Sequence, residues 1–233
     1  TTGRGTLFKD DGAPYNAGKD DLNSARNAKL IKSVRKDMLQ GKWPKDCVRC
    51  MQEEQSGLRS RRIYENESWN LTVEQAKEFT EGDGTIDAKQ VPLVYYNLRF
   101  GNLCNLACRM CGPEDSHTWY KDWAKMYGTE WDDTHGKVKL QKNSKGRWVT
   151  DAYDWHYSTK FWDHIESNLQ NIQHVYMAGG EPLLIERHYE FLQKCIDAGV
   201  AKNIIIEYNT NLTNIPHKVL PRSAERRVGT KCR

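Results

Sequence analysis

The chain has 233 residues, of which 38% are hydrophobic, and its 35 Lys and Arg residues exceed its 31 Asp and Glu residues by four charges. This length suits one large domain or one and a half ordinary ones, with a real hydrophobic core. No stretch approaches the roughly 18–20 consecutive apolar residues of a membrane span, and the first twenty residues contain no apolar signal-peptide segment. The sequence therefore predicts a cytoplasmic protein with no membrane partner.

Five of the seven cysteines fall in two tight groups, Cys47 with Cys50 and Cys104 with Cys108 and Cys111. In a reducing compartment, clustered cysteines indicate a metal site rather than disulfides. The weak and scattered positive excess does not predict a nucleic-acid partner, because such partners usually require a concentrated basic face.

The first predicted elements are two helices. Residues 22–40 carry apolar side chains at helical spacing and predict one helix that leads the chain to Cys47. We expect Thr72 to cap a second, shorter helix, because its hydroxyl can accept a hydrogen bond from an otherwise unpaired amide of the first turn.

Strands and helices then alternate along the chain. The first of these strands ends in Gly-Asn and leads directly into the second cysteine group. Three alternations argue for a parallel sheet in an α/β fold. The predicted strands are residues 93–100, 174–178 and 203–208, and the predicted helices are residues 116–126 and 185–198.

A long polar connection, residues 127–158, separates the first two of these units. Connections of this length are usually functional or disordered. We expect a surface hairpin in it, with residues 137–140 paired with residues 147–150 across a turn at residues 143–146. Residues 222–233 break the alternation of strands and helices and are interpreted as a non-native tail.

The second cysteine group has the spacing Cys-x3-Cys-x2-Cys. This spacing differs from the paired spacings of zinc sites and from the four thiolates per cluster of ferredoxins. No fourth cysteine stands nearby in the sequence. A four-iron cluster held by Cys104, Cys108 and Cys111 alone would keep one iron free to bind a small molecule.

This cysteine loop resembles the hallmark of the radical S-adenosylmethionine (SAM) superfamily. The resemblance implies a partial (β/α)6 barrel, here with about three βα units, and a [4Fe–4S] cluster on Cys104, Cys108 and Cys111. It implies that the free iron binds the amino and carboxylate groups of SAM, and that reductive cleavage gives a 5′-deoxyadenosyl radical that abstracts hydrogen from the substrate. It also implies an electron donor such as flavodoxin or ferredoxin as a partner.

A second motif, Gly179-Gly180-Glu181-Pro182, follows the strand predicted at residues 174–178. It resembles the Gly-Gly-Glu-Pro motif of the same family, which holds the SAM amino group. Two glycines allow the backbone to approach a ligand closely, and Glu181 can pair with an ammonium group at the C-terminal end of a strand. An ordinary turn explains the tetrapeptide alone, but its place one βα unit after the cysteine loop favours the cofactor site.

Two further positions match the family. Met110 stands where the family has an apolar or aromatic residue that packs near the adenine. Thr210-Asn211 resembles the Thr-Asn-Gly turn after the third strand, with Leu212 in place of the glycine. The resemblance assigns Asn211 to SAM binding, and an ordinary turn at a strand end explains the same residues equally well.

The segment that ends in Cys47 and Cys50 resembles the closing part of the SPASM and twitch modules, which carry auxiliary iron–sulfur clusters. An auxiliary cluster is therefore implied, with a zinc half-site or two unligated thiols as alternatives. The expected domains are an incomplete auxiliary segment at residues 1–90, which is helical and contains these cysteines, and an incomplete radical SAM core at residues 91–221. SPASM-like modules suggest a peptide or protein substrate by analogy.

Two other functions fit parts of the sequence. One is a non-catalytic zinc-binding interaction module, in which Cys47, Cys50 and two later cysteines form a closed site. The other is an RNA-modifying radical SAM enzyme, in which tryptophans and the densest basic cluster would contact nucleic acid. That cluster contains Arg59, Arg61 and Arg62.

Overall fold

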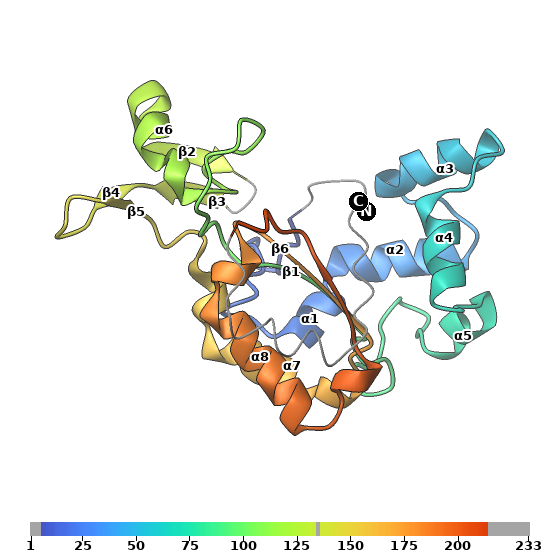
Figure 1. Ribbon diagram of the computed structural model, residues 1–233. Coiled ribbons are helices and arrows are strands. Elements are labelled where there is room, and N and C mark those ends of the chain that lie inside the picture. The colour runs from blue at the N-terminus through green and yellow to red at the C-terminus, as the bar shows by residue number, and fades with distance from the viewer. Residues whose placement is uncertain (1–5, 134–135, 214–233) are drawn as a thin grey trace. The chain divides into compact units, whose positions relative to one another are not determined.

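The computed structural model describes residues 6–133 and 136–213 and has mixed α/β structure (Figure 1). The chain divides into two compact units, Thr1–Pro92 and Leu93–Arg233. None of the helices in the described ranges is long and apolar enough to cross a membrane. The predicted tail, residues 222–233, lies outside the described residues.

The first unit is helical. Its last helix begins as predicted at Thr72, whose hydroxyl oxygen accepts a hydrogen bond from the Gln75 amide at 3.2 Å. The Gln75 side chain returns the contact by accepting from the Thr72 amide at 2.9 Å, which completes a capping box. The helices of this unit are α1 (Leu22–Arg26), α2 (Lys29–Leu39), α3 (Val48–Gln55), α4 (Arg61–Ser68) and α5 (Val73–Glu78), with a short 3-10 helix, η1 (Lys45–Cys47), before α3.

The prediction of one continuous helix over residues 22–40 is wrong, because the chain breaks between α1 and α2. Ala28 is extended there, with φ −55° and ψ 146°. The Asn27 side chain forms two hydrogen bonds with the backbone of Ile86, donating to its carbonyl at 2.9 Å and accepting from its amide at 3.1 Å. This contact across 59 residues fixes the break.

The second unit contains a three-stranded parallel sheet with the strand order β1-β6-β7. The three strands are those predicted, slightly shorter at their ends: β1 (Tyr95–Arg99), β6 (His174–Ala178) and β7 (Ile205–Tyr208). Because the strands are parallel, their carboxyl ends meet at one edge of the sheet. The described strands do not close into a barrel.

Two helices, α7 (Thr159–Ser167) and α8 (Glu186–Asp197), cover one face of this sheet (Figure 1). Helix α8 was predicted and ends before Gly199, whose φ of +70° suits a residue that closes a helix. Helix α7 was not predicted. It buries Phe161, Trp162 and Ile165, and the Trp162 ring lies 6.0 Å from the ring of Phe191 in α8.

An aromatic stack fixes the exit of β1. Phe100, the first residue after the strand, is 1% exposed, and its ring is nearly parallel to two indole rings. Trp155, in the 3-10 helix η3 (Asp154–Tyr157), lies 6.3 Å away, and Trp162 lies 5.9 Å away. The stack therefore holds the start of the cysteine loop against α7.

The long connection contains two small hairpins with a pairing different from the predicted one. Strand β3 (Gly136–Lys139) pairs with β2 (Glu130–Asp133), and only β4 (Gln141–Lys142) pairs with β5 (Trp148–Val149) across the predicted turn. Packing decides this arrangement. Val138 and Leu140 point into a separate core that also contains Tyr120 and Tyr153. Tyr120 begins α6 (Tyr120–Tyr127), which follows the 3-10 helix η2 (His117–Trp119) and confirms the helix predicted at residues 116–126.

We predict that Ile165→Ala destabilises the protein by about 2–5 kcal/mol, because it empties a fully buried position on α7. The matched control is Ile205→Ala on β7, whose side chain is 63% exposed, and it should cost less than about 1 kcal/mol. Urea unfolding measures both losses. Equal losses would show that α7 does not form the core described above.

Candidate functional site

The three cysteines lie in a loop, residues 100–116, between β1 and η2. A single buried side chain holds the two ends of this loop together. The Asn102 side-chain amide donates to the Pro113 carbonyl and to the Tyr120 hydroxyl, each at 2.6 Å. The backbone carbonyl of Asn102 also accepts from the His117 amide at 2.8 Å. Asn102 is 8% exposed, so these bonds are shielded from water.

Further hydrogen bonds fix the middle of the loop against η2. The hydroxyls of Ser116 and Thr118 both donate to the Leu106 carbonyl, at 2.6 Å and 2.9 Å. The Trp119 indole donates to the Cys108 carbonyl at 3.2 Å. Hydrogen bonds therefore hold the cysteine loop in place, although its residues form neither helix nor strand.

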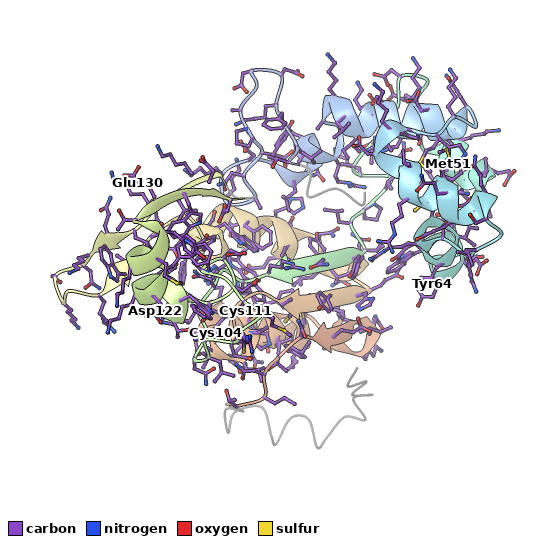
Figure 2. All side chains as sticks on the ribbon, turned by 90° about the horizontal axis from the view of Figure 1, so that it is seen from above. Met51, Tyr64, Cys104, Cys111, Asp122 and Glu130 are labelled. Atoms are coloured by element: carbon purple, nitrogen blue, oxygen red, sulfur yellow. The ribbon has the colours of Figure 1, made fainter. Side chains whose placement is uncertain are left out.

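The three thiols share one neighbourhood. Cys104 is buried, Cys108 and Cys111 are half-buried, and the Cys111 amide donates to the Cys108 carbonyl at 3.0 Å. Figure 2 shows Cys104 and Cys111 in the same part of the loop. Burial raises the pKa of the Cys111 thiol, and Asp115 and the two other thiols raise it further.

The arrangement of these thiols does not match a site for a single ion. Within residues 6–133 and 136–213, no group of three or more Cys, His, Asp or Glu side chains is placed to hold a metal ion. A closed zinc site brings its ligands around one ion, whereas the thiolates of an iron–sulfur cluster each bind a different iron. Which metal ion or cluster these thiols hold stays a prediction.

The Gly-Gly-Glu-Pro segment lies directly against the cysteine loop. The Gly180 amide donates to the Gly101 carbonyl at 2.9 Å, and the Glu181 amide donates to the Leu103 carbonyl at 2.7 Å. A Cβ atom on Gly180 would stand 2.3 Å from the Leu103 carbonyl oxygen, so only glycine fits there. In the described residues these glycines allow a close approach to the cysteine loop. The close approach to a ligand that the motif predicts stays a prediction.

The Glu181 side chain joins the ends of two strands. It is 1% exposed, and its carboxylate accepts from the Leu183 amide at 3.0 Å, the Thr210 hydroxyl at 2.6 Å and the Asn211 amide at 2.7 Å. Leu183 follows β6, and the other two donors follow β7. These three bonds satisfy the buried carboxylate, which forms no ion pair with any of the described residues. Its pairing with an ammonium group of SAM stays a prediction.

Asn211 is the residue that connects the third strand to the cysteines. Its side-chain amide lies 3.7 Å from the Cys104 sulfur and donates to the side-chain oxygen of Asn105 at 3.1 Å. Leu212 follows it with a φ of +53°, a left-handed conformation that glycine adopts easily and leucine rarely does. The structure therefore places Asn211 beside Cys104, and its contact with SAM stays a prediction.

The remaining predicted residues lie apart from this contact network. Met110 is 93% exposed at the outer turn of the loop. Cys47 and Cys50 belong to the first unit, at the start of α3, and both are half-buried. Burial raises the pKa of the Cys47 thiol, and nearby Cys50 and Asp46 raise it further. The assignment of these two cysteines to an auxiliary site stays a prediction.

His188 and Tyr208 form a buried pair that no sequence motif predicts. His188 on α8 is fully buried, and its Nε2 atom lies 2.6 Å from the Tyr208 hydroxyl at the end of β7. Burial lowers the pKa of His188 to about 4, although the Pro182 carbonyl partly opposes this effect, and burial raises the pKa of Tyr208. A histidine on an otherwise apolar helix face was the only signal in the sequence, and it does not identify a partner.

Three loops thus meet where the carboxyl ends of β1, β6 and β7 lie, the edge at which α/β sheets commonly bind ligands. They carry the cysteines, the Gly-Gly-Glu-Pro segment and Asn211. Comparisons of the chain with protein-family models, curated proteins and solved structures find no match. The site is therefore interpreted from its own geometry and chemistry.

We predict that Gly180→Ala lowers the free energy of unfolding by about 3 kcal/mol, because the added methyl group overlaps the Leu103 carbonyl. It should also speed labelling of the buried Cys104 thiol by a disulfide reagent. Gly82→Ala is the matched control, because a Cβ there meets nothing within 4 Å. Unchanged stability and labelling in Gly180→Ala would contradict the close contact of the two loops.

We predict that His188 makes stability fall as the pH is lowered. Its pKa moves from 6.5 in the unfolded chain to about 4 in the fold, so between these values the unfolded chain binds a proton that the folded protein does not. The loss is at most about 1.4 kcal/mol per pH unit. Urea unfolding across this pH range measures it.

Two variants separate titration from packing at this pair. His188→Gln should remove this part of the pH dependence. Tyr208→Phe keeps the histidine and should lower stability by about 0.5–1.5 kcal/mol at every pH, with the dependence retained. If His188→Gln retains the full dependence, another group is responsible.

Proposed function

We propose that this protein is a radical SAM enzyme. The observation that carries the proposal is the direct hydrogen bonding of the Gly-Gly-Glu-Pro segment to the three-cysteine loop, through the Gly101 and Leu103 carbonyls. The two motifs stand about 70 residues apart in the sequence, and each alone has an ordinary explanation. Their contact at the carboxyl ends of adjacent parallel strands supports one shared site.

The donor set fits a [4Fe–4S] cluster with one open iron. Cys104, Cys108 and Cys111 would each hold one iron, and the loop lacks a fourth cysteine. The Asn211 amide beside the Cys104 sulfur supports this assignment, because hydrogen bonds to cluster sulfurs adjust the reduction potential.

The residues that would hold SAM lie around the same loop. Gly179, Gly180, Glu181 and Pro182 would position its amino group, Asn211 would contact it from β7, and the exposed Met110 side chain would pack near the adenine. A bound cluster would supply the electron, drawn from flavodoxin or ferredoxin, for the cleavage of SAM to methionine and 5′-deoxyadenosine, with one hydrogen atom taken from the substrate.

The polar side chains on one face of the sheet support a partial (β/α)6 barrel. Parallel sheets are normally covered on both faces and have apolar strands. Here the face opposite α7 and α8 is polar, and the strand register places several of its residues in one row. Such a face suits the lining of a barrel around a polar substrate, for which we propose a peptide or protein. The row contains Asn97, Tyr176 and Glu207, and Arg99 lies on the same face.

Two parts of the proposal concern the rest of the protein. Cys47 and Cys50 would bind an auxiliary iron–sulfur cluster in the first unit. The enzyme would work in the cytoplasm, where small electron-transfer proteins and reduced thiols are available.

We predict that anaerobic reconstitution with ferrous iron and sulfide gives a brown protein that forms 5′-deoxyadenosine from SAM when reduced with dithionite. Replacing Cys104, Cys108 and Cys111 together by Ala should abolish 5′-deoxyadenosine formation and the iron held by the triad, because no other thiolates replace them. Iron and sulfide analysis, absorption spectra and product chromatography measure these effects.

The control is Cys195→Ala, which removes a buried thiol on α8 and should leave iron content and product unchanged. A colourless protein that binds four-coordinate zinc through the same cysteines would instead support the zinc-binding module. Iron binding that persists in the triad variant at the wild-type level would place the cluster elsewhere.

A further inference from the structure

The β4–β5 hairpin carries a concentration of positive charge that overall composition hides. Residues 136–150 contain five Lys and Arg residues and no Asp or Glu. Two of the five, Lys137 and Lys139 on β3, are paired with Glu130 on β2. The other three, Lys142, Lys145 and Arg147, have no carboxylate partner in the described ranges of the chain, and all three are exposed.

The turn of this hairpin is firmly built. The Asn143 side-chain oxygen accepts from the backbone amides of Lys145 and Arg147, both at 3.0 Å, and the Asn143 amide donates to the Arg147 carbonyl at 2.9 Å. Gly146 completes the turn with a φ of +70°. The three cations therefore project from a short, fixed two-stranded ribbon, which extends away from the rest of its unit (Figure 1).

The other basic cluster of the chain differs in this respect. Each arginine of the cluster in the first unit forms an ion pair with a nearby glutamate, so its positive charge is largely neutralised locally. The pairs are Arg59–Glu67, Arg61–Glu65 and Arg62–Glu54. The cations of the hairpin thus differ from this cluster in having no carboxylate partner among the described residues, and the RNA contact expected of the cluster stays a prediction.

We infer that the β4–β5 hairpin is a docking arm for the phosphate backbone of a nucleic acid. Protein interfaces are depleted in Lys and have an apolar or aromatic core, whereas the hairpin is rich in Lys and exposes only Val149 among its large apolar residues. A two-stranded ribbon of cations without carboxylates suits a polymer of regularly spaced negative charges.

The hairpin contacts are independent of base sequence. Lys142 lies over the Trp148 ring at 5.1 Å from its centroid, and Trp148 also packs against the core formed by Tyr120, Val138, Leu140 and Tyr153. The indole is therefore engaged within the protein and does not provide a platform for stacked bases. Phosphate contacts alone position a nucleic acid without reading its sequence.

The test measures binding of a fluorescent single-stranded RNA and of a duplex DNA, each of mixed sequence, across a range of salt concentrations. The plot of log K against log salt has a negative slope, and the loss of three phosphate contacts should reduce its magnitude by about 2 for the RNA and about 3 for the duplex. The variant is the triple substitution Lys142→Gln, Lys145→Gln and Arg147→Gln. Binding of either polymer with this change supports the inference, and the comparison shows which one the arm prefers.

The matched control removes the same charge from arginines that are exposed and ion-paired: Arg49→Gln, Arg59→Gln and Arg61→Gln. It should keep the wild-type slope. Equal losses in the two triple variants would reduce the effect to net charge and overturn the inference. The inference would also be overturned if the wild-type protein bound neither polymer, or if its binding did not depend on salt. Competition by poly-L-glutamate as strong as by RNA would identify an acidic polypeptide as the partner instead.

Discussion

The arrangement of the site depends on a hydrogen-bond ladder that continues past the ends of β1 and β6. The Phe100 amide donates to the Ala178 carbonyl at 2.9 Å, and the Gly180 and Glu181 amides then donate to the Gly101 and Leu103 carbonyls. The strand register is thereby carried into the cysteine loop, whose residues have no regular structure of their own. Because a Cβ atom on Gly180 would overlap the backbone opposite, the ladder requires glycine at this position. The sheet therefore fixes the start of the cysteine loop, and the hydrogen bonds of Asn102, Ser116, Thr118 and Trp119 fix the rest of it.

The buried Glu181 carboxylate extends this coupling to the third strand. A charge removed from water is stable only when hydrogen bonds replace its hydration, and the three donors at Glu181 do so. Two of these donors come from the turn after β7, so Glu181 and the Thr210-Asn211 segment fix each other. A ligand at this edge would meet groups that are already positioned, which lowers the ordering cost of binding.

Local signals and long-range contacts account for what the sequence could and could not predict. The strands, α8 and the Thr72 cap follow from neighbouring residues, and all were predictable. The break at Asn27 depends on Ile86, and the pairing of β3 depends on a core shared with Tyr120, so neither is visible in a short window. Cysteine spacing indicates chemistry because it reflects the ligand itself. The partners of Glu181 and His188 come from other strands and helices, and no spacing encodes them.

The turn at Asn211 shows how the same coupling sustains an unfavourable backbone. Leu212 has a φ of +53°, which costs a residue other than glycine about 1–2 kcal/mol. The cost is borne because Asn211 is held on both sides: its side-chain oxygen accepts from the Thr213 amide at 2.9 Å, and its backbone amide donates to Glu181. With both ends fixed, the side-chain amide is left directed at Asn105 and the Cys104 sulfur. The strained backbone at Leu212 therefore accompanies the contact between Asn211 and the Cys104 sulfur, and a glycine at residue 212 would relieve the strain.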